Sequence, residues 1–167
     1  MSLFFESDNL TLGYGNQLVI KNLDISLNFS KNYEITGKNG SGKTTLIMCI
    51  SKNFIGNTFN SNIRRKDTSL MEIGSSPSLM PELSLLENIK YFLFNDNINE
   101  KMITNVLNKY ELESFKSDLV RDFSSGMIKR SEIAIADLKN PKVLCIDEPR
   151  VYPVSYTHLT LPTKRIV

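Results

Sequence analysis

Residues Gly37 to Thr44 read GKNGSGKT, and their types and spacing suit the binding of a phosphate chain. They satisfy the pattern G-x4-G-K-[ST] in full. Gly37, Gly40 and Gly42 let main-chain N–H groups turn inward around phosphate oxygens, where a side chain would strain the loop or block the approach. Lys43 supplies a positive charge to the β and γ phosphates, and Thr44 offers a hydroxyl to Mg²⁺. An ordinary glycine turn needs neither group at these offsets, so the pattern predicts a nucleotide phosphate site.

A second candidate site follows the apolar run KVLCID, which closes on the adjacent carboxylates Asp147 and Glu148. A continuous apolar run fits a parallel strand that is covered on both faces. Ligands of open α/β sheets bind at the carboxyl ends of such strands. We therefore expect Asp147 to hold Mg²⁺ and Glu148 to act as the catalytic residue that polarises the attacking water. The alternative is a carboxylate pair that only caps a strand end in solvent, and the phosphate loop upstream argues against it.

The elements expected around the phosphate loop are strands followed by one helix. Residues 3–13 and 18–28 alternate apolar with polar, which predicts two antiparallel strands joined by a turn at 13–16. NYEITG predicts a short strand before the loop, and LIMCI predicts a helix after it. A further strand is expected from residue 69 to residue 74. The order strand, glycine loop, helix is the one that phosphate binding requires.

A helical subdomain is expected at about residues 82–139, between two strands of the core. Ser84 with Glu87 three positions later forms a capping box before LLENIKYFLF. Ser124 caps another helix, which runs to about Leu138. Between these two, one face of a further helix is made by Met102, Ile103, Val106, Leu107 and Tyr110. The long helical stretch separates the phosphate loop from the carboxylate pair.

Composition predicts one globular domain and excludes two classes of protein. The 167 residues are 41% hydrophobic and 23% charged, with a formal net charge of +2, which fits neither a disordered chain nor a strongly basic nucleic-acid binder. Cys49 and Cys145 lie far apart in apolar runs, so we expect buried free thiols in a reducing compartment. Residues 53–68 are polar and contain Arg64, Arg65 and Lys66, and we expect a solvated loop or short hairpin without assigned function.

Together these motifs resemble the ATP-binding cassette (ABC) family over residues 1 to about 149. FSSGMIKR, at 123–130, resembles a degenerate form of the family signature LSGGQ and stands in the family's register before the DEP segment. The resemblance implies that Ser124, Ser125 and Gly126 close over the γ-phosphate held by a second subunit in a head-to-tail dimer. A hydroxyl and a helix N-terminus aimed at an anion suit that role. The third and fifth letters depart from the signature, so a plain N-capped helix is the alternative.

The resemblance implies ATP and Mg²⁺ as cofactors and assigns residues to both. The implied nucleotide-binding residues are Tyr14, Gly37, Asn39, Gly40, Ser41, Gly42, Lys43, Thr44 and Thr45. The implied metal ligands are Thr44, Asp147 and Ser76. Tyr14 stands where the family has an aromatic residue that stacks on adenine, although a tyrosine packed under the sheet is an equal alternative. Ser76 replaces the usual glutamine and is shorter, so it would need a bridging water.

The implied fold is α/β: a P-loop NTPase core with an incomplete parallel sheet, an N-terminal antiparallel edge sheet and a helical insert. The implied function is ATP binding and, in the intact parent protein, ATP hydrolysis that drives an ABC membrane transporter, expected to be an exporter. The implied partners are a transmembrane permease subunit and a second ATP-binding subunit, with no nucleic acid. Because MSLFFESDNL does not look like a leader and no run is long enough to span a bilayer, we expect a cytoplasmic protein held at the inner membrane through the permease.

The alternative function is a nucleotide-binding regulatory module that does not hydrolyse ATP, and Ser76 and Met127 favour it. A chromosome-structure or DNA-repair ATPase would share these motifs. That group places long coiled coils after the phosphate loop, whereas residues 45–122 hold no sustained heptads.

The last segment, residues 150–167, does not continue the family pattern. The family follows its DEP with a loop that crosses the dimer axis, two more strands and a histidine far downstream, whereas His158 comes too early for that role. VSYTHLTLPTKRIV resembles a translated cloning adapter. We therefore expect residues 1–149 to be a truncated ABC ATPase domain, and residues 150–167 to be non-native or disordered. A chain of this kind is expected to hydrolyse no ATP by itself.

Overall fold

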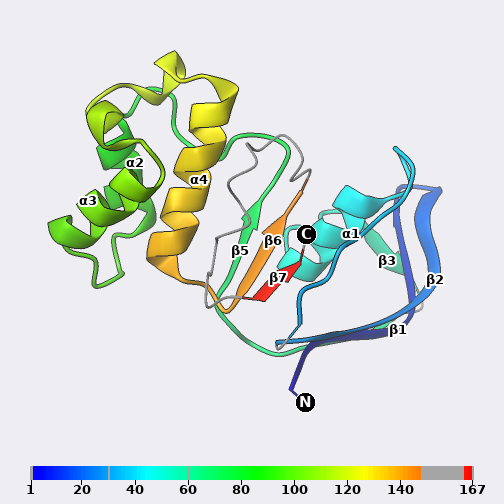
Figure 1. Ribbon diagram of the computed structural model, residues 1–167. Coiled ribbons are helices and arrows are strands. Elements are labelled where there is room, and N and C mark those ends of the chain that lie inside the picture. Colours follow the sequence, from blue (N-terminus) through cyan, green and yellow to red (C-terminus); the bar gives the residue numbers. More distant parts are fainter. Residues whose placement is uncertain (1, 30, 60, 148–163, 167) are drawn as a thin grey trace. The chain divides into compact units, whose positions relative to one another are not determined.

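A computed structural model describes residues 2–29, 31–59, 61–147 and 164–166 of the chain (Figure 1). The chain divides into two compact units. Of the described residues, those at 2–72, 142–147 and 164–166 belong to the first unit and those at 73–141 to the second.

The first unit is built on a long antiparallel hairpin. β1, Leu3–Tyr14, pairs with β2, Gln17–Asn28, and Gly15 between them takes a left-handed φ of 56°. Leu10 and Leu12 of β1 are completely buried, and Phe4 and Phe5 belong to the same hydrophobic core. The hairpin predicted from the alternating pattern is thus present in the structure.

Two short strands extend this sheet along the other edge of β1. β3, Asn57–Phe59, and β4, Asn62–Arg65, both run antiparallel to β1, with Phe59 opposite Thr11. The expectation of a solvated loop or a short hairpin was wrong, because both strands pair with β1. The free edge of β1 offers main-chain N–H and C=O groups, and these order a segment whose polar sequence gives no strand signal.

Contacts within the first unit account for both arginines of the basic run. The guanidinium of Arg64 pairs with Glu6 at 3.2 Å and with Asp8 at 3.1 Å. Arg65 Nη2 donates to the carbonyl oxygen of Cys49 at 2.7 Å. These arginines therefore join strands to each other and to a helix, and the absence of a nucleic-acid role stays a prediction.

The same unit contains one helix and a small second sheet. α1, Lys43–Ser51, packs its apolar residues into the core that β1 lines. The second sheet has the order β5, β6, β7, formed by Leu70–Ile73, Val143–Ile146 and Lys164–Ile166. β6 and β7 are parallel. All four residues of β6 are buried, as its continuous apolar run predicts.

The strand predicted for NYEITG is not formed, apart from an isolated bridge residue at Tyr33. A strand this short needs a partner, and in the described sheet β6 already has β5 on one side and β7 on the other. Tyr33 instead accepts a hydrogen bond from the main-chain N–H of Asn28 at 2.8 Å, and Ile35 packs against the core. The segment thus leads from the end of β2 to the phosphate loop as an irregular connection.

The second unit contains three α-helices in its described part. They are α2, Leu85–Phe92, α3, Glu100–Lys109, and α4, Ser125–Lys139, and α4 lies beside both of the others (Figure 1). Two 3₁₀ turns, Glu113–Phe115 and Val120–Asp122, precede α4. The helices lie where the sequence pattern places them.

The capping box predicted before α2 is complete. The N–H of Glu87 donates to Ser84 Oγ at 3.2 Å, and the N–H of Ser84 donates to Glu87 Oε2 at 2.8 Å. The Ser84 hydroxyl also donates to Glu87 Oε2 at 2.7 Å, and this bond, together with the one from the Ser84 N–H, lowers the pKa of the Glu87 carboxyl because both favour its ionised form. Two N–H groups at the start of the helix are thereby satisfied.

Both cysteines are buried free thiols, as the sequence predicts. Burial raises the pKa of Cys145 to about 12, and the nearby carboxylate of Glu72 adds to this effect. Burial also raises the pKa of Cys49, while the guanidinium of Arg65 opposes the shift. Within the described residues, no helix combines the length and apolar character that crossing a membrane requires.

Candidate functional site

The phosphate loop is a tight main-chain turn that leads directly into α1. Gly40 and Gly42 have φ values of 78° and 92°, which residues with a side chain rarely adopt. A Cβ atom on Gly42 would also lie 2.9 Å from Cγ1 of Val19 on β2. The glycine pattern in the sequence is therefore required both by the turn and by the strand behind it.

Lys43 is the first residue of α1, and its ammonium folds back over the loop. Nζ donates to the carbonyl oxygens of Gly37 and Lys38, each at 3.0 Å. The first turn of α1 contains no acidic side chain, so the partial positive charge of the helix N-terminus is not neutralised there. A lysine and a helix N-terminus at one loop form a site that favours a phosphate.

Thr44 brings the two sequence motifs together. Its Oγ1 donates to Oδ2 of Asp147 at 2.7 Å, although the two residues are 103 positions apart. Thr44 belongs to the first turn of α1, and Asp147 directly follows β6 and is only 4% exposed. The structure thus places the carboxylate predicted from KVLCID beside the phosphate loop.

This pair of oxygen atoms fits Mg²⁺. The ion prefers oxygen ligands at about 2.0–2.1 Å in octahedral geometry, in which neighbouring ligand oxygens lie about 2.9 Å apart. The 2.7 Å separation of Thr44 Oγ1 and Asp147 Oδ2 is close to that spacing. Mg²⁺ also keeps several waters and needs only one or two carboxylates from the protein. Among the described residues no group of three or more His, Cys, Asp or Glu could hold a metal ion.

The other predicted residues of the loop differ in their exposure. Asn39 and Ser41 are exposed, and the N–H of Ser41 donates to the carbonyl oxygen of Lys38 at 3.1 Å. Thr45 is only 7% exposed, on the side of α1 that faces the core. Their assignment to nucleotide binding stays a prediction.

Tyr14 lies at the end of β1 with 47% of its surface exposed. Its ring packs edge-on against Phe54, with 5.4 Å between the ring centroids. Phe54 was not predicted from the sequence, although an aromatic residue just after the predicted helix was a usable signal. Stacking of Tyr14 on adenine stays a prediction.

The signature segment begins α4 in the second unit. Ser124 is the N-cap, and its Oγ accepts the N–H of Met127 at 3.3 Å. Ser124 and Ser125 are exposed, and the position of a Cβ on Gly126 is nearly free of neighbours. This geometry is that of an N-capped helix with an accessible N-terminus, which both interpretations of the segment require.

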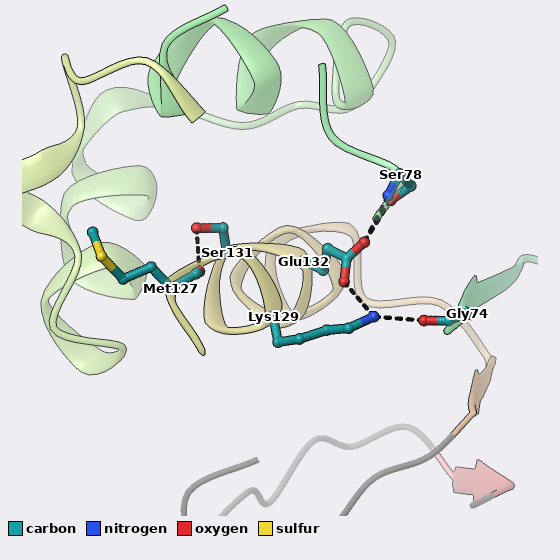
Figure 2. Close-up of polar contacts among 6 residues, drawn as sticks. All are labelled: Gly74, Ser78, Met127, Lys129, Ser131 and Glu132. Atoms are coloured by element: carbon teal, nitrogen blue, oxygen red, sulfur yellow. Dashed lines mark hydrogen bonds and ion pairs between the residues drawn. The ribbon is translucent and has the colours of Figure 1, made fainter. Parts of the chain in front are cut away.

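Ser76 lies in the exposed loop that follows β5, also in the second unit. Lys129 and Glu132 of α4, which were not predicted from the sequence, contact this loop at Gly74 and Ser78 (Figure 2). No local pattern could have revealed these contacts, because their partners are more than fifty positions apart.

Glu148, the predicted catalytic residue, lies outside the described residues, as do residues 149–163 and Val167. Its role and the predicted character of the tail stay predictions. Within the tail, the described residues form β7.

A glycine loop that runs into a helix, with its threonine bonded to an aspartate at a strand end, defines a phosphate-binding domain of the P-loop class. The chain belongs to the ABC transporter family, whose family model matches residues 20–151. The sequence resemblance to this family is thereby confirmed.

Several curated relatives are ATP-binding proteins of transport or resistance systems. The lantibiotic transport ATP-binding protein SrtF of Streptococcus pyogenes is 35% identical over 150 residues, which cover 84% of this chain and 64% of that protein. The bacitracin transport ATP-binding protein BcrA of Enterococcus faecalis is 26% identical over 89% of this chain and 52% of its own length. The linearmycin resistance ATP-binding protein LnrL of Bacillus subtilis is 29% identical over 96% of this chain and 57% of its own length. The chain thus spans between half and two thirds of these relatives.

Solved structures confirm the predicted fold class. An ATP-binding subunit of an ABC transporter aligns with a TM-score of 0.77 and 23% identity, covering 90% of this chain and 69% of that one. An ABC transporter ATP-binding protein from Pyrococcus furiosus aligns with a TM-score of 0.74 and 21% identity, covering 87% of this chain and 75% of that one. At these identities the likeness supports the fold alone.

Proposed function

We propose that this chain binds Mg²⁺ and ATP as the nucleotide-binding part of a transporter ATPase. The observation that carries the proposal is the hydrogen bond between Thr44 and Asp147, because it joins the phosphate loop to a carboxylate at a strand end. A glycine turn of purely structural use would not need a hydroxyl and a carboxylate to meet there.

Each group of the site has a defined task in this proposal. Main-chain N–H groups of the phosphate loop and the N-terminus of α1 surround the phosphates, and Lys43 Nζ moves from the loop carbonyls to the phosphate oxygens. Thr44 and Asp147 hold Mg²⁺, with Ser76 contributing through a water. When bound, Mg²⁺ neutralises charge on the phosphate chain. Tyr14, supported by Phe54, presents an exposed aromatic face suited to stacking on adenine.

Hydrolysis is proposed for the whole protein. Glu148 would polarise the water that attacks the γ-phosphate, and Ser124, Ser125 and Gly126 of a second subunit would close over that phosphate in a head-to-tail dimer. The alternative of a non-hydrolysing module rests on Ser76 in place of glutamine. Phosphate release by the whole protein, and its loss in Glu148→Gln, would decide between the two.

Export is the proposed direction of transport, with a permease subunit as the partner that holds the protein at the cytoplasmic face of the inner membrane. The names of SrtF, BcrA and LnrL concern lantibiotics, bacitracin and linearmycin. These names favour export of an antibiotic. An import protein for spermidine and putrescine is also 30% identical, so the direction depends on which permease the protein serves.

Calorimetry of ATP binding tests the proposal. Lys43→Ala should weaken binding by about 1.5–3 kcal/mol, because a hydrogen bond to a charged group is lost. Lys38→Ala is the matched control, since it removes an exposed lysine from the same loop and leaves in place the carbonyl that Lys43 contacts. Equal ATP affinity for folded wild type and Lys43→Ala would refute nucleotide binding at this loop.

A further inference from the structure

Two side chains of α4 hold both ends of the loop that follows β5 (Figure 2). Glu132 Oε1 accepts hydrogen bonds from the main-chain N–H of Ser78 at 2.8 Å and from its hydroxyl at 3.0 Å. Lys129 Nζ donates to the carbonyl oxygen of Gly74 at 2.5 Å and pairs with Glu132 Oε2 at 3.1 Å. We call Lys129 and Glu132, with their contacts to Gly74 and Ser78, the loop clamp.

The ion pair of the loop clamp is buried. The side chain of Glu132 is completely inaccessible, and that of Lys129 is 11% exposed. Removing two charges from water is costly, and an apolar pair of similar volume is often at least as stable. Added stability is therefore a weak explanation for the buried charges of Lys129 and Glu132. A stronger explanation is that they fix the position of the loop.

The clamp fixes the ends of the loop and leaves its middle open. Gly74 and Ser78 are bound, whereas Ser75 and Ser76 between them are exposed. Only three residues separate the two bound ends, so the main chain between them has little freedom. The exposed hydroxyls are consequently presented from a fixed backbone.

A fixed backbone matters more for serine than for glutamine. A long side chain can search for its partner by rotating several bonds, whereas a serine hydroxyl lies one bond from Cβ and is placed mainly by its backbone. Small misplacements of a positioning group can cost large factors in activity. A loop that offers Ser76 to a metal-bound water thus needs a rigid mounting.

We propose that Lys129 and Glu132 are positioning residues, which hold Ser76 in place for the Mg²⁺ shell and attach its loop to the helix that begins with the signature segment. This inference rests on the proposed function. Lys129 lies one helical turn after Ser125, so the loop and the start of α4 share one rigid support.

Amide hydrogen exchange by NMR tests the clamp without nucleotide. Glu132→Ala should raise exchange of the Ser78 amide at least about tenfold, because the N–H loses its acceptor. Glu132→Gln keeps an acceptor oxygen and should raise it less. Lys109→Met is the matched control, because it breaks a 2.7 Å ion pair between α3 and Asp137 of α4, away from the loop.

The folding state of each variant is read from the same spectra. A positioning role predicts faster exchange in residues 74–78 with unchanged exchange at buried Leu107 and Ile133. A purely structural role predicts the same factor at all of these amides and would overturn the proposal. If Glu132→Ala does not fold, the double variant Lys129→Met/Glu132→Met removes both charges and the acceptor of the Ser78 N–H, keeps side chains of similar size, and gives the same test. An unchanged Ser78 amide in a folded variant would also overturn it.

Calorimetry on the same proteins tests the link to Ser76. Mg²⁺ should strengthen ATP binding in wild type, and Glu132→Ala should reduce that gain by about tenfold, as is usual when a residue that supports a metal ligand is lost. The affinity for ATP with EDTA should not change. A full Mg²⁺ gain in a variant with a loosened loop would refute the role toward Ser76. Absence of ATP binding in wild type would instead refute the proposed function, and with it the metal role. The hydrogen-exchange data would still show whether Glu132 holds the loop.

Discussion

Thr44→Val should destabilise the first unit, because it removes the hydroxyl that binds Asp147. Oγ1 of Thr44 donates to Oδ2 of Asp147 at 2.7 Å, and Asp147 is 4% exposed. Hydrogen bonds to charged groups contribute about 1.5–3 kcal/mol, and the substitution leaves the carboxylate without this donor in a place that water hardly reaches. The free energy of unfolding should therefore fall by about 2 kcal/mol.

Urea denaturation and thermal melting measure this loss. The urea midpoint should decrease without a change in the denaturant slope, and the melting temperature should fall by about 4–8 °C for a chain of this length. Thr44→Ser is the control, since it keeps the hydroxyl and should remain near wild type. In the double variant Thr44→Val/Asp147→Asn, the effects should differ from additivity by about 1 kcal/mol, because the two side chains share one interaction.

The same variant tests the metal site. Mg²⁺ should strengthen ATP binding by wild type and by Thr44→Ser, and much less by Thr44→Val, which offers no oxygen ligand. If Thr44→Val unfolds at the same urea concentration as wild type, the bond to Asp147 contributes nothing in solution. If Mg²⁺ strengthens ATP binding equally in Thr44→Val and wild type, Thr44 is not a ligand, and the reasoning from the 2.7 Å contact fails.

Two further predictions follow from the shifted pKa values. The pKa of the Glu87 carboxyl is lowered by its bonds to Ser84, so its stabilising effect is present above the ordinary carboxyl pKa and is lost as pH falls through the lower folded value. Ser84→Ala should lower the melting temperature by about 2–4 °C at pH 7, and a gap that stays constant into acid would contradict this. The pKa of Cys145 is raised from 9.0 to about 12, because burial favours the neutral thiol in the folded state. Its contribution to the free energy of unfolding is therefore complete below pH 9 and decreases as pH rises toward 12, by up to about 1.4 kcal/mol per pH unit. Cys145→Ala should flatten the alkaline decline in unfolding free energy, and an equally steep decline would show that the thiol does not cause it.

Features that depend on neighbouring residues were predictable from the sequence. The phosphate loop, the capping box at Ser84 and the N-cap at Ser124 are each specified within eight positions, so their local chemistry is readable without knowledge of the fold. The meeting of Thr44 with Asp147 was also predictable in outline, because strand ends and phosphate loops converge in open α/β sheets.

Features that depend on distant partners were not predictable. The NYEITG segment has the pattern of a strand, but a strand forms only where a neighbour is free to pair. The polar residues of β3 and β4 lack that pattern and form strands because β1 offers them an edge. The role of Glu132 was not predictable for the same reason. A single acidic residue in a helix has the pattern of a surface residue, and its partner, the N–H of Ser78, is distant in sequence.

The first unit is discontinuous in sequence, and this has a consequence for the order in which the protein folds as it is made. The core of that unit combines α1 and β1 with Val143 and Cys145 of β6. A chain leaving the ribosome therefore presents α1 about one hundred residues before its last core partners exist. The helices between them rely on local contacts and form fast. The phosphate site is thus completed after the helices of the second unit, and a nascent chain able to hold nucleotide has already made these helices. Nucleotide binding by the nascent chain would then show that synthesis has passed Asp147.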